Sequence, residues 1–154
     1  NGHFLESKTN ICLLGQTRTG KTHIATAIAY EACKKNHSVL FFSAAKLVND
    51  LIHARKNSGF PHIQHKLAKA NLIVIDELGY IPFSKEGAEF LFQFFSDAYE
   101  RQSLIVTSNL EFSNWTSFMG DATMTSALLD RLTHHCEIIP VNGESFRFKQ
   151  RKNA

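Results

Sequence analysis

Along the chain, short apolar runs alternate with longer stretches in which apolar positions recur at helical spacing. Short apolar, β-branched runs predict strands, and longer amphipathic stretches between them predict helices. The expected strands are residues 10–14, 38–42, 71–75, 104–107 and 137–141, and the expected helices are residues 21–35, 44–55, 84–101 and 123–132. We interpret Gly59–Phe60–Pro61 as a loop within one domain.

This alternation predicts an α/β fold in which helices cover a parallel sheet. The run Asn71-Leu-Ile-Val-Ile75 is apolar at almost every position, which is typical of a central parallel strand buried on both faces. The longest helix has Ser84 at its N-cap position. A length of 154 residues fits one compact domain, so we expect residues 1–154 to form a single unit.

Composition narrows the class of protein. A hydrophobic share of 44% is high enough to build a core, and no apolar run approaches the ~20 residues of a membrane-spanning helix. The net charge of +3 is too small to indicate nucleic-acid binding by itself. Three cysteines at unrelated spacings predict reduced thiols in a cytoplasmic protein.

The clearest chemical signal is a complete match to G-x-x-x-x-G-K-[ST] between the first strand and the first helix. Glycines let the backbone N–H groups of such a loop approach a phosphate closely. The lysine reaches the β- and γ-phosphates of a nucleotide, and the last hydroxyl is a ligand for Mg²⁺. The predicted ATP-binding residues are Gly15, Gln16, Thr17, Arg18, Thr19, Gly20, Lys21 and Thr22.

Polar residues at the ends of two later strands predict the rest of the site. Asp76 and Glu77 follow the apolar run, at the edge where open α/β sheets bind ligands. We assign Asp76 to Mg²⁺ and Glu77 to the attacking water; the alternative is a solvated strand end. Asn109 ends the fourth strand and is expected to bond to the γ-phosphate or to that water, unless it only forms an Asx turn.

These residues together resemble the AAA+ ATPases, and within them the IstB-like transposition helper ATPases of the IstB/DnaC-like group. The resemblance covers residues 4–148 and is carried by LIVIDELGYIPF, SKEGAEFLFQFF, IVTSNL, LLDRLTHH and GESFR. It implies a P-loop NTPase three-layer sandwich with five parallel strands in the order 5-1-4-3-2. It also implies that Asp76 and Glu77 form the Walker B pair and that Asn109 is the sensor-1 residue.

The resemblance further implies an arginine finger, Arg131, that completes the site of a neighbouring subunit in a homo-oligomer, and therefore weak ATPase activity in the monomer. The alternative is a surface arginine paired with Asp130 or Glu137. Only about nine residues precede the first strand and 13 follow Val141. We therefore expect the chain to lack the family's N-terminal partner-binding region and the C-terminal helical lid of other AAA+ proteins.

Two further groups of residues have open interpretations. The basic tail contains four cations: Arg147, Lys149, Arg151 and Lys152. It is either a solvated chain end or a sequence-independent contact to duplex DNA. In the second case the DNA contact also includes Lys46, Arg55, Lys66 and Lys69. Arg147 is also a candidate for contacting nucleotide across an interface. Aromatic residues near the acidic pair either pack in the core, which we favour, or contact a partner; they are Tyr80, Phe83, Phe112, Trp115 and Phe118.

Three function classes follow. The one we favour is a helper ATPase of insertion-sequence DNA transposition that binds ATP and Mg²⁺, binds duplex DNA and activates or recruits a transposase. The alternatives are a replicative helicase loader of the DnaC type and a nucleotide-binding switch with slow hydrolysis. The DELGYIPFS stretch at residues 76–84 favours the first.

Overall fold

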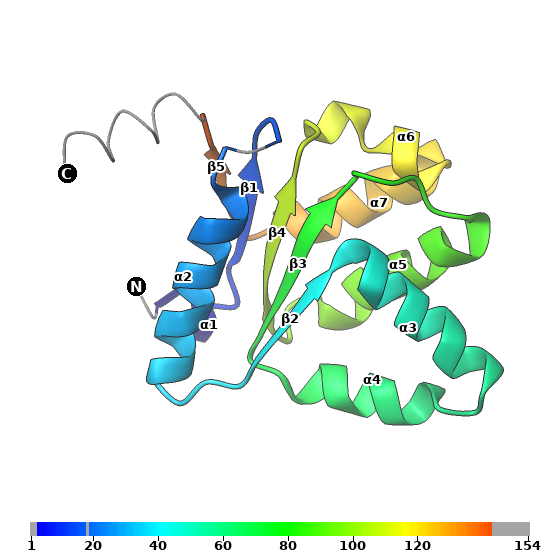
Figure 1. The fold of residues 1–154 in the computed structure, drawn as a ribbon, viewed down its shortest axis with the longest axis horizontal. Helices are drawn as coiled ribbons and strands as arrows, with labels where there is room; N and C mark the ends of the chain where they lie inside the picture. The colour runs from blue at the N-terminus through cyan, green and yellow to red at the C-terminus, as the bar shows by residue number, and fades with distance from the viewer. Residues whose placement is uncertain (1–2, 18, 143–154) are drawn as a thin grey trace.

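A computed structural model describes residues 3–17 and 19–142 of the protein, which form a five-stranded parallel sheet (Figure 1). The strands pair in the order β2-β3-β4-β1-β5, which confirms the expected order 5-1-4-3-2. Their bounds are β1 (Asn10–Leu14), β2 (Val39–Ser43), β3 (Leu72–Leu78), β4 (Ser103–Ser108) and β5 (Cys136–Pro140). All four pairings are parallel, so the carboxyl ends of the strands meet at one edge.

Helices cover both faces of the sheet and give three layers. On one face lie α1 (His3–Glu6) and α2 (Lys21–Lys34), and on the other lie α3 (Ala44–Lys56), α5 (Lys85–Ala98) and α7 (Ala122–Thr133) (Figure 1). Shorter elements complete the chain: α4 (Phe60–Lys69), the 3-10 helix η1 (Phe112–Asn114) and α6 (Thr116–Met119).

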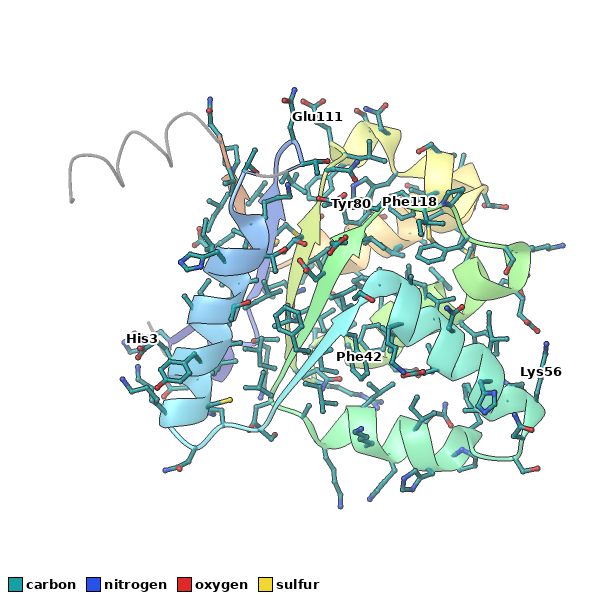
Figure 2. All side chains as sticks on the ribbon, viewed as in Figure 1. His3, Phe42, Lys56, Tyr80, Glu111 and Phe118 are labelled. Carbon is teal, nitrogen blue, oxygen red and sulfur yellow. The ribbon has the colours of Figure 1, made fainter. Side chains whose placement is uncertain are left out.

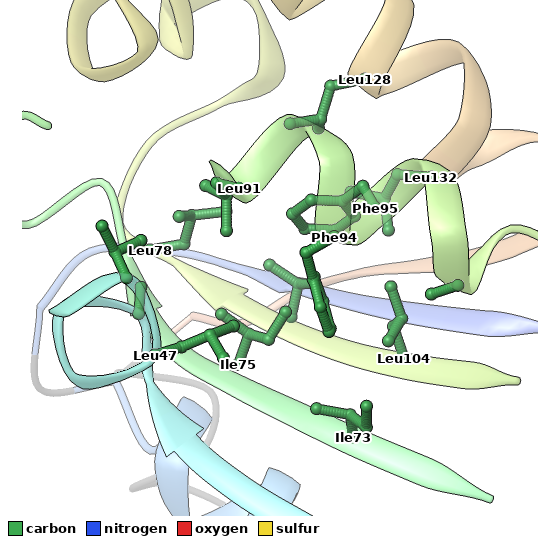
Figure 3. Close-up of a cluster of buried hydrophobic side chains, with 14 of the residues drawn as sticks. Leu47, Ile73, Ile75, Leu78, Leu91, Phe94, Phe95, Leu104, Leu128 and Leu132 are labelled. Atoms are coloured by element: carbon green, nitrogen blue, oxygen red, sulfur yellow. The ribbon is translucent and has the colours of Figure 1, made fainter. Parts of the chain in front are cut away.

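The two faces of β3 belong to different cores, because successive side chains of a strand point to opposite sides. Leu72 and Val74 pack in the core beneath α2, whereas Ile73 and Ile75 pack beneath α3 and α5 (Figure 3). All four side chains are fully buried. The predicted central strand is thus confirmed, and its carboxyl end is fixed by packing from both sides.

The helix α4 corrects the interpretation of residues 59–61 as a loop. Gly59 is the N-cap of this helix, and Pro61 lies in its first turn, where a missing N–H and a fixed φ favour helix initiation. Phe60, Ile63 and Leu67 recur at helical spacing and pack against the core beneath α5. The sequence therefore contains a signal for this helix, namely apolar residues at helical spacing and a proline in the first turn.

Side-chain caps fix the starts of three helices. The Ser84 hydroxyl accepts a hydrogen bond from the N–H of Gly87 (3.0 Å), which confirms the predicted cap of α5. Ser43 and Asp121 cap α3 and α7 in the same way. Within residues 3–17 and 19–142, no helix is both long and apolar enough to cross a lipid bilayer.

Candidate ATP-binding site

The phosphate loop connects β1 to α2 and lies against Val141, the residue that follows β5. A Cβ atom at Gly15 would lie 2.1 Å from the carbonyl oxygen of Val141, so only glycine fits there. Gly20 has a left-handed φ of 94° and is the N-cap of α2, with no side-chain cap on the first N–H groups of the helix. Such uncapped N–H groups at the positive end of a helix dipole are suited to binding phosphate. Arg18 lies outside the described residues.

Lys21 is buried inside this loop. Its Nζ donates to the carbonyl oxygens of Gly15 and Gln16, both at 2.6 Å, and to the hydroxyl of Thr19 at 3.2 Å. Burial lowers the pKa of Lys21 below the ordinary value for lysine, and the nearby carboxylates oppose this shift. Among the described residues, the hydrogen-bond acceptors of the ammonium group are all neutral, and an anionic phosphate would replace them favourably.

Thr22 and Asp76 meet at the carboxyl edge of the sheet, as the sequence predicted for a Mg²⁺ site. The Thr22 hydroxyl lies 3.0 and 2.9 Å from the two carboxylate oxygens of Asp76, and Asp76 is 4% exposed. A hydroxyl and a carboxylate are the hard oxygen ligands that Mg²⁺ prefers. These two residues would hold the ion together with nucleotide phosphates.

Glu77 lies in a β-bulge of β3. Ile75 is opposite Val106 and Leu78 is opposite Ser108, so β3 uses one more residue than β4 between these pairs. The extra residue is Glu77, with a left-handed φ of 62° and an exposed side chain. Leu78 thereby takes the next core position after Ile75, and Glu77 is turned away from the core.

Asn109 follows β4 and lines a cleft of about 610 Å³ together with Gly15, Gln16 and Thr19 of the phosphate loop. Its Oδ1 is buried and has no hydrogen-bond partner among the described residues. A buried polar atom without a partner is costly, which is typical of a site that a ligand or water completes. The structure thus brings Asn109 to the loop, as predicted.

Arg131 is not part of this cluster. It lies in the last turns of α7, where its Nη1 donates to the carbonyl of Ala127 (3.0 Å) and its guanidinium is 5.2 Å from the ring centre of Phe92. Among the described residues it forms no ion pair with Asp130 or Glu137. Arg147, Lys149, Arg151 and Lys152 lie outside the described residues.

Thr107 was not assigned a role from the sequence, and Tyr80 was not predicted to contact the phosphate loop. The Thr107 hydroxyl donates to Asp76 Oδ1 and accepts from the N–H of Glu77, because β4 places it beside the bulge. Tyr80 lies at the carboxyl edge of the sheet (Figure 2) and contacts the Thr17 side chain. Burial raises the pKa of Tyr80, and the hydrogen bond with Thr17 opposes the shift. Thr107 and Ser108 precede Asn109 in the sequence, which is a weak signal that they lie near the site. Their hydrogen bonds to β3 become apparent only from the pairing of β3 with β4.

Four of the five aromatic residues near the acidic pair pack in or against the core, as predicted, and Tyr80 is not among the side chains of that core. Trp115 and Phe118 are buried, and Phe83 and Phe112 are partly buried against the same core. Tyr80 is half-buried.

A sequence profile of the family described as IstB-like ATP binding protein matches residues 2–154. A protein of Pseudomonas aeruginosa named for insertion sequence IS21 and ATP binding is 36% identical over 98% of this chain and 57% of its own length. Similarly named proteins of Bacillus thuringiensis subsp. berliner (IS232) and Geobacillus stearothermophilus (IS5376) are also 36% identical, over 95% and 97% of this chain. The chain spans 58% and 59% of these two relatives.

Solved structures show the same fold at lower identity. The DnaC helicase loader superposes with a TM-score of 0.76 at 19% identity, covering 91% of this chain and 85% of DnaC. DnaA from Aquifex aeolicus bound to AMPPCP gives a TM-score of 0.78 at 19% identity, over 97% of this chain and 48% of DnaA. These likenesses establish an AAA+ P-loop ATPase fold. The family profile matches residues 2–154, and the phosphate loop and the Thr22–Asp76 pair agree with it. The chain therefore belongs to the family of IstB-like ATP-binding proteins.

Proposed function

We propose that this chain hydrolyses ATP as a helper protein of insertion-sequence DNA transposition, binding duplex DNA without sequence preference and activating or recruiting a transposase. The observation that carries the ATPase part is the convergence of Thr22, Asp76, Glu77 and Asn109 beside one phosphate loop. The names of its relatives, which refer to insertion sequences and ATP binding, support the biological context.

The loop residues 15–22 would bind the triphosphate through backbone N–H groups and the charge of Lys21. Thr22 and Asp76 would hold Mg²⁺, which would supply positive charge to offset the negative charge that develops on the phosphates. Glu77 would orient and polarise the attacking water, because the bulge leaves its carboxylate exposed at this edge. Asn109 would donate its amide N–H to the γ-phosphate or to the same water.

Arg131 would act on the site of a neighbouring subunit. It lies near the end of α7, the helix that leads into β5, and is only partly buried. An arginine supplied across an interface stabilises charge in the transition state and is commonly worth about 10³–10⁵ in turnover. We therefore expect weak activity in the monomer and stronger activity in the homo-oligomer.

A basic stripe on α4 supports the DNA part of the proposal. His62, His65, Lys66 and Lys69 recur at spacings of three and four residues and are exposed, so they share one side of the helix. The helix contains no acidic residue, and in the described part of the chain Lys66 and Lys69 form no ion pair. By contrast, Lys46 pairs with Asp50 at 2.7 Å.

Arg55 has a different environment from these lysines. Its guanidinium lies 4.5 Å from the ring centre of Phe60 and 5.5 Å from that of Phe90. Its stem and charge are therefore engaged in packing, and Lys66 and Lys69 are the better candidates for phosphate contacts.

ATP turnover against protein concentration, with and without duplex DNA, tests the proposal in three proteins: the unaltered chain, Glu77→Gln and Arg131→Ala. We expect turnover to rise with concentration and with DNA, and both substitutions to abolish the rise while ATP still binds. Turnover that is independent of concentration and unaffected by Arg131→Ala would reject the shared site.

The runner-up function is a replicative helicase loader of the DnaC type. It would use the same ATPase core but prefer single-stranded DNA and a helicase partner. A comparison of single- and double-stranded DNA in the turnover assay separates the two, since stronger stimulation by single strands would favour the loader. ATP binding without hydrolysis in every condition would favour a nucleotide-binding switch.

A further inference from the structure

One buried hydroxyl connects the metal-binding and the water-activating halves of the candidate site. Thr107 Oγ1 donates to Asp76 Oδ1 at 2.5 Å and accepts from the backbone N–H of Glu77 at 2.8 Å. Thr107 is 1% exposed, so water does not compete for these bonds. We infer that Thr107 is a positioning residue that sets the orientation of the Asp76 carboxylate and holds the bulge that presents Glu77.

The direction of the two hydrogen bonds follows from the chemistry of the groups. A backbone N–H only donates, so the Thr107 oxygen must accept from Glu77. Its single proton is then free to point at the carboxylate of Asp76, which accepts. Both bonding capacities are used in one arrangement, and the bond to a carboxylate is of the charge-assisted, stronger kind.

The bond to Asp76 limits the rotation of its carboxylate relative to the phosphate loop. Oδ1 lies within hydrogen-bond distance of both Thr107 and Thr22, whereas among the described residues Oδ2 is bonded only to Thr22, at 2.9 Å. Rotation of the carboxylate would break the short bond to Thr107. The carboxylate therefore stays directed toward the Thr22 hydroxyl, which lies 3.0 and 2.9 Å from its two oxygens, and the two groups would hold Mg²⁺ together.

The bond to Glu77 offsets a strained backbone. A left-handed φ is unfavourable for a residue with a Cβ atom, and Glu77 adopts one at 62°. Thr107 fixes the N–H of this residue, and the neighbouring Ser108 hydroxyl donates to the carbonyl of Leu78 at 2.6 Å. Two consecutive side chains of β4 thus fasten the bulge on both sides of Glu77.

The matched pair Thr107→Val and Thr107→Ser tests this inference, which rests on the proposed ATPase function. Valine keeps the shape but loses both bonds, and serine keeps the hydroxyl. We expect Thr107→Val to lower kcat on the order of tenfold or more, with KM for ATP nearly unchanged and a higher Mg²⁺ concentration for half-maximal turnover. Thr107→Ser should restore most of kcat.

Ser103→Ala is the control for lost stability. Ser103 is a buried hydroxyl on the same strand that donates to the carbonyl of Phe4 (3.0 Å), at the opposite end from Asp76. It should lower the melting temperature without changing kcat or the Mg²⁺ requirement. If Thr107→Val matches the unaltered chain in kcat and Mg²⁺ requirement, or if Thr107→Ser is as impaired as Thr107→Val, the inference is wrong.

Amide hydrogen exchange at Glu77 separates this inference from the proposed function. Loss of the bond should speed exchange of the Glu77 N–H in Thr107→Val but not in Thr107→Ser, whether or not ATP is hydrolysed. If the unaltered chain lacks turnover yet shows this exchange pattern and a Thr107-dependent Mg²⁺ requirement for binding an ATP analogue, only the ATPase proposal fails. Equal Glu77 exchange in all three proteins would overturn the positioning role.

Discussion

The Thr22 hydroxyl and the Asp76 carboxylate, 54 residues apart in the sequence, are joined by a hydrogen bond of 2.9 Å. Thr22 is the second residue of α2, directly after the phosphate loop, and Asp76 is a buried residue of β3 next to the bulge. Their contact brings two separate sequence motifs into one candidate metal site.

Asp76→Asn should remove the effect of Mg²⁺ on ATP affinity. The amide oxygen still accepts from Thr22, but the negative charge that attracts the ion is lost. We expect Mg²⁺ to strengthen binding of a fluorescent ATP analogue to the unaltered chain and to change it by less than about twofold in the variant. Asp97→Asn, an exposed carboxylate of α5, is the control and should behave as the unaltered chain. A full Mg²⁺ response in Asp76→Asn would contradict the assignment.

Asn109→Ala should reduce turnover far more than ATP affinity. Its buried Oδ1 has no partner in the described part of the chain, and its amide faces the cleft beside the phosphate loop. Removing one donor to a developing negative charge costs on the order of 10²–10³ in kcat. Asn114→Ala changes an exposed amide of the same cleft and serves as the matched control. Equal kcat values for both variants would exclude the predicted role of Asn109.

ATP affinity should begin to fall at a lower pH than it would if Lys21 had the pKa of an ordinary lysine. Burial lowers the pKa of Lys21 from the ordinary value of 10.5 in the free site, and only the charged form attracts phosphate. Affinity should be constant below the pKa of the free site and decrease as the pH rises through it, because binding then requires proton uptake. Titration of analogue binding from pH 7 to about 10, without Mg²⁺, measures this. Constant affinity throughout that range would refute the lowered pKa.

Gly15→Ala should destabilise the fold. The added Cβ would overlap the carbonyl oxygen of Val141, and because this oxygen belongs to the backbone, no side-chain rotation can relieve the clash. We expect a loss of about 1–3 kcal/mol or more in the free energy of unfolding, measured by urea denaturation. Gly59→Ala is the control, because the nearest atom to its Cβ would be 3.9 Å away. If both substitutions have the same small effect on the free energy of unfolding, the contact between Gly15 and Val141 is looser than described.

Neutralising Lys66 and Lys69 together should weaken binding of duplex DNA and its dependence on salt. Each lysine that contacts a phosphate contributes about 0.9 to the slope of log affinity against log salt. The variant Lys66→Gln/Lys69→Gln should therefore reduce that slope by about 2. Lys35→Gln changes the C-cap residue of α2, which is not part of the basic stripe on α4, and should leave the slope unchanged. An unchanged slope in the double variant would remove α4 from the DNA proposal.

The local pattern was sufficient for most of the secondary structure. The apolar run at residues 71–75, the cap at Ser84 and the glycine-lysine motif at residues 15–22 depend on neighbours in sequence, and all lie where predicted. Strand ends differed from the predicted ones by three residues at most, and the largest difference is in β3, which continues through the bulge to Leu78. The helix α4 was missed although its period and its proline were readable.

The sequence by itself determined which residues have the chemistry of a phosphate and Mg²⁺ site, since that chemistry depends on residue type and short spacing. Only the tertiary structure decided how these residues meet. Strand pairing brings Thr22 to Asp76 and allows the two hydrogen bonds of Thr107. It also places the carbonyl oxygen of Val141 close to Gly15. The bulge at Glu77 has the same origin: Leu78 must fill the core position after Ile75, and this long-range packing requirement has no local signal in the sequence.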